Sequence, residues 1–257
     1  MPENSTLLNT GPAVWALLAV LLPVAAAVAR SALGLPVRQL LAAGLRALLQ
    51  LAGVAVAIAV LSRSAVLSAG FLLLMVLVAA WTAARRIGGN TGVHLAVLPI
   101  LAGAAPVAGL MFAAGVLPPL PLAWLAVCGQ LIGGAMTATS LAGRRIGAEL
   151  ALRHGEVEAG LALGLEPRAA RALVARPVAH EALLPALDQT RTVGMVTLPG
   201  AFVGLVLGGA SPIDAGLVQL LVLVSLLVVE AIAVAVLAFL AESGMIRPPH
   251  TGDTAQA

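Results

Sequence analysis

The 257-residue sequence is 61% apolar and only 10% charged, and its formal net charge is +3. Soluble domains average about 45–50% apolar and about 25% charged residues, so this composition excludes an ordinary soluble domain. It predicts a helical protein that crosses the membrane many times. All fourteen basic residues are arginine. Because a Walker-type phosphate loop needs a lysine, we do not expect this chain to hydrolyse ATP or to be an enzyme.

Seven apolar runs follow one another along the chain, each near the roughly 20 residues that cross the hydrocarbon core of a bilayer. They cover residues 12–29, 40–61, 66–84, 93–116, 120–142, 192–209 and 215–240. The sequence therefore predicts an all-α polytopic transmembrane helical bundle of about seven spans. One transmembrane domain, 12–242, would lie between a polar N-terminal tail at 1–11 and a polar C-terminal tail at 243–257.

The arginines predict the orientation of these spans. With seven spans, every arginine except Arg63 falls on one side of the membrane. Cytoplasmic loops carry the excess of positive charge, so we expect the N-terminus outside, the C-terminus inside and the long polar segment 143–191 in the cytoplasm. These arginines are expected to set orientation, and no nucleic-acid partner is predicted. The chain is thus expected to be a multi-pass protein of the cell (inner) membrane.

The segment 143–191 changes from continuously apolar to amphipathic, which indicates that the fifth span continues as a helix beyond the membrane. Gly164 would interrupt that helix. Pro167 stands at a position that a first helical turn tolerates, and Pro177 would end the second short helix. The sequence predicts a helix, a glycine turn, a short helix and a return helix.

Two features inside the spans have both a functional and a structural interpretation. Pro199 and Gly200 lie in the middle of the sixth run, so that span is expected to be kinked or broken. Such interruptions line transport paths or simply help helices to pack. Glu230 lies near the middle of the last run, where a charge costs about 3 kcal/mol or more. It would therefore be protonated, paired with a partner or facing water, or it would act as a polar contact between helices. Gln50, Gln130 and Gln219 are neutral polar candidates to line the same interior.

No metal site is predicted. None of the four histidines pairs with a cysteine or a second histidine at ligand spacing, and the single Cys128 allows no internal disulfide. Met75, Met136 and Met195 offer thioether groups, although methionine in an apolar helix usually serves packing.

Several motifs resemble one family of membrane proteins. The motifs in the polar segment are Glu158-Ala159, Gly164, Val174-Ala175-Arg176-Pro177 and Pro185; in the spans they are Gln50-Leu51, Ala83-Ala84-Arg85-Arg86, Met136-Thr137-Ala138, Ser140-Leu141, Thr192 to Gly200, Gly204, Gly209-Ala210, Pro212 and Gln219. Over residues 36–240, and most closely over 129–220, the chain is similar to FetB-type ABC transporter permeases. That family forms the membrane half of bacterial iron-export systems and includes plant aluminium-tolerance permeases.

The resemblance implies a homodimeric permease, powered by a separate ATP-binding subunit that carries ATP and Mg while this chain carries no cofactor. It implies that the cytoplasmic loop couples to the ATPase through Glu158, Ala159, Gly164, Pro167 and Pro177. The expected translocation path, from the resemblance and the polar residues of the spans together, is lined by Glu230, Gln50, Met136, Thr137, Met195, Pro199 and Gly200. The cargo would be a metal ion or another small solute, and the direction would be export.

The chain departs from the family pattern at several positions. Gly134 and Thr137 stand where the family has asparagine, and residues 201–205 are more apolar than their family counterparts. These changes weigh against a metal cargo more than against the fold. Two other functions stay open: a secondary transporter that uses Glu230 as a proton or ion site, and a membrane assembly protein without transport.

Overall fold

The computed structural model describes residues 11–61, 64–88 and 91–246. Within these ranges, six helices are long and apolar enough to cross a membrane: α1 (Pro12–Leu33), α2 (Val37–Leu61), α3 (Ala65–Ile87), α4 (Val93–Ala113), α5 (Pro121–Leu152) and α10 (Pro212–Glu242). The prediction of an all-α polytopic membrane protein is therefore confirmed. The predictions that concern residues 1–10, Arg63 and 247–257 lie outside the described residues.

The chain divides into two compact units, 1–63 and 64–257. In the first unit, α1 and α2 form a helical hairpin. Gly34 ends α1 with φ +68°, and its N–H group bonds to the carbonyl groups of Ala29 and Arg30. The two helices approach closely at Gly44, where an added Cβ atom would lie 2.6 Å from the side chain of Leu22. The missing side chain at position 44 lets this hairpin close.

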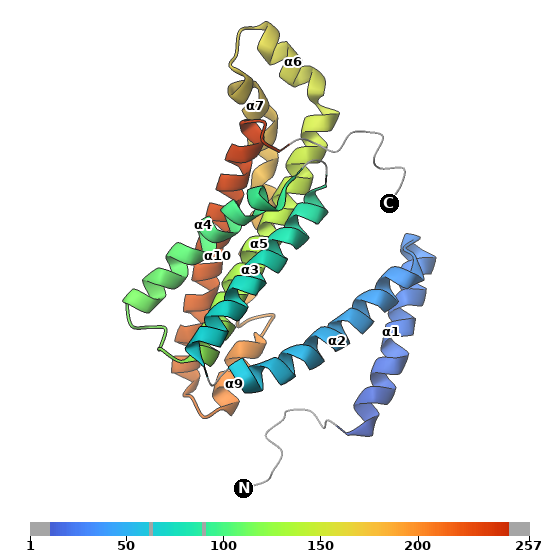
Figure 1. Ribbon diagram of the computed structural model, residues 1–257. Helices are drawn as coiled ribbons and strands as arrows, with labels where there is room; N and C mark the ends of the chain where they lie inside the picture. Colours follow the sequence, from blue (N-terminus) through green and yellow to red (C-terminus); the bar gives the residue numbers. More distant parts are fainter. Residues whose placement is uncertain (1–10, 62–63, 89–90, 247–257) are drawn as a thin grey trace. The chain divides into compact units, whose positions relative to one another are not determined.

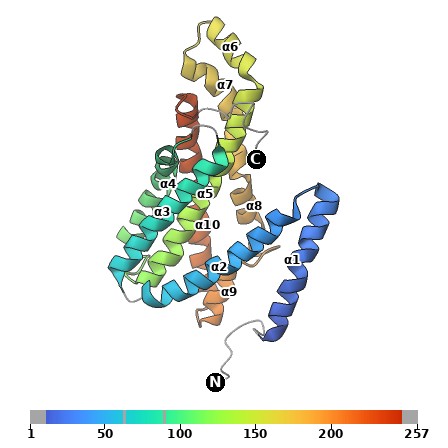
Figure 2. The same ribbon diagram turned by 45° about the vertical axis from the view of Figure 1, so that its right-hand side comes forward.

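The second unit is a bundle of α3, α4, α5 and α10, with shorter helices at its ends (Figures 1 and 2). The shorter elements are α6 (His154–Ala162), α7 (Pro167–Ala179), the 3₁₀ helix η1 (His180–Leu183), α8 (Leu184–Thr192) and α9 (Gly200–Leu207). One apolar core fills the middle of the four long helices, and a second joins α5, α7 and α10 around Ile146, Val174 and Leu237. The second core holds the short helices against the bundle.

Three of the four long helices run in the same direction. Gly129 of α5 lies beside Met75 of α3, and fourteen residues further along, Gly143 lies beside Ile87. Gly134 of α5 lies beside Leu226 of α10, which runs parallel to it, whereas α4 runs the opposite way (Figure 1). Because α5 and α10 both start at the same end of the bundle, the chain must return between them through residues 153–211.

The expected sixth span, 192–209, is not a single helix. Residues 193–199 are non-helical, with a bridge between Val193 and Thr197, and α9 has only eight residues. An eight-residue helix is about 12 Å long and cannot cross a bilayer alone. The returning chain is therefore built from α8, this irregular segment and α9, as the proline and glycine in the run suggested.

α5 continues well past the expected end of its span at residue 142. Its 32 residues make it roughly 48 Å long, against a hydrocarbon core of about 30 Å. At its end, α6 and α7 form a hairpin beyond the bundle (Figure 2). Pro177 lies inside α7 and does not end it, because the helix continues to Ala179 and then tightens into η1. The start of the expected C-terminal tail also packs, since Ile246 is buried.

Candidate functional site

A polar cavity of about 490 Å³ lies inside the second unit, between α5, η1, α8, the start of α9 and α10. Its polar lining consists of Gln130 and Thr137 of α5, Gln189 of α8, and Gln219 and Glu230 of α10. Glycine, alanine, proline, valine and leucine residues form the remaining wall. Among the described residues no three histidine, cysteine or acidic side chains gather around a common point. The cavity thus offers carboxamides, one hydroxyl and one carboxylate.

Helical periodicity places the α10 residues of this lining on one face. Gln219, Leu223, Leu226 and Glu230 follow at spacings of four, three and four residues. Gln219 is only 7% exposed, and its side-chain oxygen has no hydrogen-bond partner in the described structure. A buried acceptor without a partner is uncommon. It marks this wall as a place where a polar ligand or water would be stabilised.

Glu230 is half-buried, and no described residue forms an ion pair or hydrogen bond with its carboxylate. The carboxylate reaches the cavity because the neighbouring position on α5 is Gly134. A Cβ atom at that position would lie 2.9 Å from Oε1 of Glu230 and 2.7 Å from the side chain of Leu226. The glycine therefore makes room for the acidic group.

The structure brings only some of the predicted path residues together. Glu230, Thr137, Pro199 and Gly200 all line the cavity, and the hydroxyl of Thr137 also donates to the carbonyl of Gly133 at 3.0 Å. Met136 packs against the apolar core instead. Met195 is 89% exposed in the irregular segment, and Gln50 belongs to α2 of the first unit, where it is exposed. The polar groups of the second unit converge, whereas the thioethers do not.

The predicted coupling residues lie on the α6–α7 hairpin, and all of them are exposed: Glu158, Ala159, Gly164, Pro167 and Pro177. His154 lies 3.3 Å from the Glu158 carboxylate, one helical turn away. α6 and α7 approach at Gly160, where a Cβ atom would lie 3.3 Å from that of Ala170. At this position a glycine lets the two helices lie close together.

The hairpin turn has a fixed geometry. Gly164 adopts φ +87°, which is left-handed and costs a residue with a side chain about 1–2 kcal/mol. The N–H of Leu165 donates to the carbonyl of Gly160 at 3.1 Å, so the turn closes the end of α6. Leu163 at the tip is 86% exposed. The hairpin thus presents an ordered, partly apolar tip to solvent.

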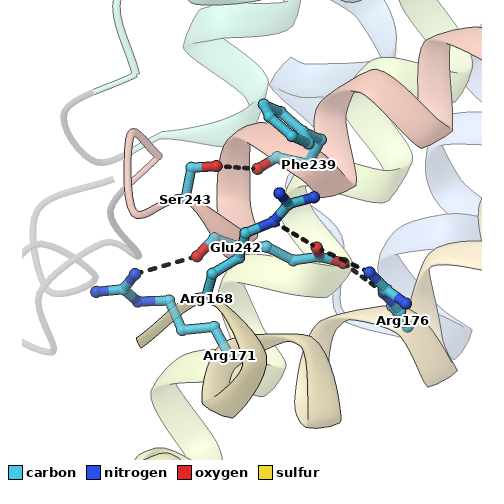
Figure 3. Close-up of polar contacts among 6 residues, drawn as sticks. All are labelled: Arg168, Arg171, Arg176, Phe239, Glu242 and Ser243. Carbon is cyan, nitrogen blue, oxygen red and sulfur yellow. Dashed lines mark hydrogen bonds and ion pairs between the residues drawn. The ribbon is translucent and has the colours of Figure 1, made fainter. Parts of the chain in front are cut away.

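α7 is joined to the end of α10 by a cluster of charged residues (Figure 3). Nε and Nη2 of Arg176 donate to the two carboxylate oxygens of Glu242 at 2.9 and 3.3 Å. Nε of Arg168 lies 3.5 Å from the same carboxylate, and Nη1 of Arg171 donates to the Glu242 main-chain carbonyl at 3.1 Å. The hydrogen bond and charge of Glu242 raise the pKa of the Arg176 guanidinium. The contact with Glu242 therefore favours the charged form of Arg176.

Sequence reasoning missed two parts of this arrangement. Gln189 lies in a segment that hydropathy does not mark as part of the bundle, so nothing in the sequence placed it beside Glu230. Glu242 follows the last apolar run and reads as a surface residue. The signal that could have identified it is the spacing of Arg168, Arg171 and Arg176, which brings three positive charges to one side of a helix.

Comparison with known proteins adds evidence of relationship. Residues 13–246 match the uncharacterised protein family UPF0014. The chain is 40% identical over 152 residues to the UPF0014 membrane protein STAR2 of Oryza sativa subsp. japonica, which is 59% of this chain and 53% of that protein. It is 29% identical over 177 residues to the probable iron export permease protein FetB of Escherichia coli, covering 67% of this chain and 68% of that protein.

A third relative is the UPF0014 membrane protein slr1647 of Synechocystis, 33% identical over 204 residues, which cover 76% of this chain and 78% of that protein. The chain spans little more than half the length of the plant relatives that it matches. No solved structure matches this chain.

Proposed function

The chain belongs to the UPF0014 family of membrane proteins, and on this premise we propose that it is the membrane-spanning permease subunit of an ABC transporter. A separate ATP-binding subunit, carrying ATP and Mg, drives it from the cytoplasm. Two copies of this chain form the permease, in the cell (inner) membrane. As a multi-pass membrane protein similar to named permeases, the chain itself is a non-enzymatic subunit.

One observation carries this proposal: the exposed hairpin and the polar cavity are built on the same two helices. α6 follows directly from α5, and α7 packs against both α5 and α10, the helices that line the cavity. A force on the hairpin therefore acts on the cavity walls without passing through a flexible linker. ATP binding closes the ATPase subunits against the hairpins, and the resulting tilt of α5 and α10 opens the cavity on the other side.

The orientation follows from the basic residues. Arg85, Arg86, Arg144 and Arg145 lie at the end of the bundle that carries the hairpin. Because cytoplasmic ends carry the excess of arginine, we place the hairpin in the cytoplasm, with the N-terminus outside and the C-terminus inside. The ATP-binding subunit meets the exposed tip around Gly164 there.

The proposed cargo is a metal cation or another small polar solute, and its direction is export. The similarity to FetB, named a probable iron export permease, supports a cationic cargo. So does the Glu230 carboxylate, which lines the cavity together with three carboxamides and one hydroxyl. The cavity contains none of the thioether groups that soft metals prefer, which favours a cargo bound through oxygen.

The decisive experiment combines capture with transport. The tagged chain is co-expressed with the ATP-binding cassette subunit of its own source, purified, and reconstituted into liposomes. We expect a stable complex that hydrolyses ATP and moves iron(II) only when ATP is supplied. A Glu158→Ala exchange on the exposed hairpin should weaken the capture. Cargo movement that persists without any ATPase would refute the proposal.

A second candidate, a proton- or ion-coupled secondary transporter, is favoured by one observation. The Glu230 carboxylate has no ion partner among the described residues and lies in a cavity at the middle of α10. An acidic group in that position can exchange a proton or a cation with water. This candidate predicts transport that depends on a proton gradient and is indifferent to ATP, so the reconstitution separates the two functions.

A further inference from the structure

We propose that Glu242 is a positioning residue that transmits movement of the α6–α7 hairpin to the wall of the cavity. This inference rests on the proposed function, because it assumes a partner that moves the hairpin. It adds the specific contact through which that movement reaches α10. The contact consists of the Glu242 carboxylate and the three arginines of α7 that hold it, hereafter the Glu242 clamp (Figure 3).

The burial of Glu242 distinguishes it from the other charged groups in the described ranges. The residue is 2% exposed, and in the described part of the chain it is the only charged residue that is buried. Its partners are exposed, Arg176 at 68% and Arg168 at 50%, so the carboxylate alone is buried. In the other ion pairs between described residues both side chains lie at the surface, for example Arg145 with Glu181, at 51% and 32%. Surface pairs contribute little to fixing a structure. A buried carboxylate that accepts a hydrogen bond on each of its two oxygens holds its partner in one arrangement.

The clamp fixes α7 to α10 at more than one point. The guanidinium fork of Arg176 bonds to both carboxylate oxygens, a geometry that sets the angle as well as the distance. Arg171 holds the main-chain carbonyl at the end of α10. Arg168 reaches the carboxylate, and its guanidinium lies 4.2 Å from the ring centre of Phe239. The arginines of α7 thus contact the side chain and main chain of Glu242 and the ring of Phe239. Because of these contacts, α7 cannot slide or rotate without moving the end of α10.

α10 connects the clamp to the cavity as a continuous helix. It contains no proline after its first turn, so nothing in its backbone absorbs a bend. Glu230 precedes Glu242 by twelve residues, or about 18 Å along the helix axis. The return segment on the other side of the cavity is broken at residues 193–199. A rigid wall thus faces a deformable one, and movement of α7 shifts the Glu230 side of the cavity.

The simpler alternative is that the clamp only anchors α7 for folding. The test therefore measures a cavity response to nucleotide in the complete complex with the ATP-binding subunit, in lipid nanodiscs. The parent protein for this test carries two exchanges. Leu226→Cys places a reporter cysteine in the cavity lining on α10, and Cys128→Ala removes the native cysteine. The rate at which a water-soluble cationic methanethiosulfonate modifies the reporter cysteine is measured without nucleotide and with ATP, Mg and vanadate.

In the parent complex, nucleotide should change the modification rate by about threefold or more, as expected for a shift between two conformations. Glu242→Gln, which keeps the shape but removes the charge, should bring that ratio close to one. The same variant should still capture the ATPase and hydrolyse ATP at a rate within about twofold of the parent. The matched control is Glu181→Gln, the same exchange in the exposed Arg145 pair, which should leave the nucleotide response unchanged.

An unchanged nucleotide response in Glu242→Gln overturns the inference. The inference is also overturned if Glu242→Gln loses the response because it no longer binds the ATPase. If Glu242→Gln does not yield a folded complex, Arg176→Gln decides by the same criteria, because it removes the fork while Arg168 still pairs with the carboxylate. A parent that captures no ATPase, or shows no nucleotide response, refutes the proposed function and the inference with it. A parent that responds while Glu242→Gln responds equally refutes the inference alone.

Discussion

Oε1 of Glu230 lies 2.9 Å from the point that a Cβ atom on residue 134 would occupy, so a side chain at Gly134 of α5 would displace the Glu230 carboxylate of α10 from its present position. The acidic group of the cavity depends on the absence of a side chain across from it. The charge in the cavity therefore depends on two helices, because α10 supplies the carboxylate and α5 supplies the space for it.

Gly134→Ala should therefore destabilise the protein. The new methyl group must displace the ends of the Leu226 and Glu230 side chains. Because both ends are flexible, the cost should lie near the lower end of the about 1–3 kcal/mol typical of overpacking. The matched exchange Gly133→Ala, one residue earlier in the same helix, meets no atom within 4 Å and should be neutral or stabilising by up to about 1 kcal/mol. Thermal unfolding midpoints of the purified proteins measure both. Equal midpoints for the two variants would show that Glu230 does not pack against α5.

Glu230→Gln should reduce ATP-dependent cargo movement about tenfold, which corresponds to about 1.4 kcal/mol, because a neutral amide attracts a cation less than a carboxylate does. Iron(II) entry into inside-out vesicles is the measurement. Glu149→Gln, the same exchange on the part of α5 beyond the cavity lining, serves as the control. Undiminished transport in Glu230→Gln would reduce that glutamate to a packing residue.

The sequence predicts the long helices well because length and hydropathy alone determine them. Each of the first five apolar runs and the last one corresponds to one helix. The sixth run is counted as a span because hydropathy averages over 192–209. The interruption at Pro199 is predicted by the residue type, whereas the turn at Gly194, with φ +80°, is not. The polar helix α8, which precedes the interruption, contains too few apolar residues to be recognised as part of a crossing.

The candidate site is predictable only in part, for the same reason. Glu230 stands out because a charge in an apolar run is costly. Gln189 does not stand out, because its place in the cavity depends on how a polar segment folds back onto α10. Met136 and Met195 carry thioethers that suit a metal path, yet Met136 packs against the core and Met195 is exposed and does not line the cavity. Whether these side chains line the cavity depends on their direction in the folded chain, which a short motif does not predict.

Gly164→Ala should loosen the tip of the hairpin. At φ +87° a Cβ atom costs about 1–2 kcal/mol, so the turn adopts other conformations. We expect weaker capture of the ATP-binding subunit, measured as the ratio of the two subunits after purification. Gly155→Ala lies in the same hairpin, where no atom is within 4 Å and φ is ordinary, and it should leave the ratio intact. Equal ratios for both variants would exclude a role for the turn.

The start of α6 should loosen in acid. The hydrogen bond from Arg153, at 2.7 Å, lowers the pKa of the Glu156 carboxylate below its ordinary value of 4.5. Because the folded value is the lower one, this pair contributes its full stability above about pH 4.5 and loses it as the pH falls through the lowered pKa. Amide protection factors in α6 should therefore be constant near neutral pH and decrease in acid. A decrease of the same size in Glu156→Gln would assign it to another group.

The return of the chain between α5 and α10 should be visible as a change of side. α5 and α10 run in parallel, so the hairpin tip and the turn before α10 lie at opposite ends of the bundle (Figure 1). Single cysteines at Leu163 and Ala210, in a Cys128→Ala background, should react with an impermeant maleimide from the cytoplasm and from outside, respectively. A cysteine at Val116, in the turn before α5, should share the side of residue 210, because α5 and α10 start at the same end. Labelling of 163 and 210 from one side would mean that residues 153–211 form a re-entrant segment, and it would remove the basis for placing the N-terminus outside.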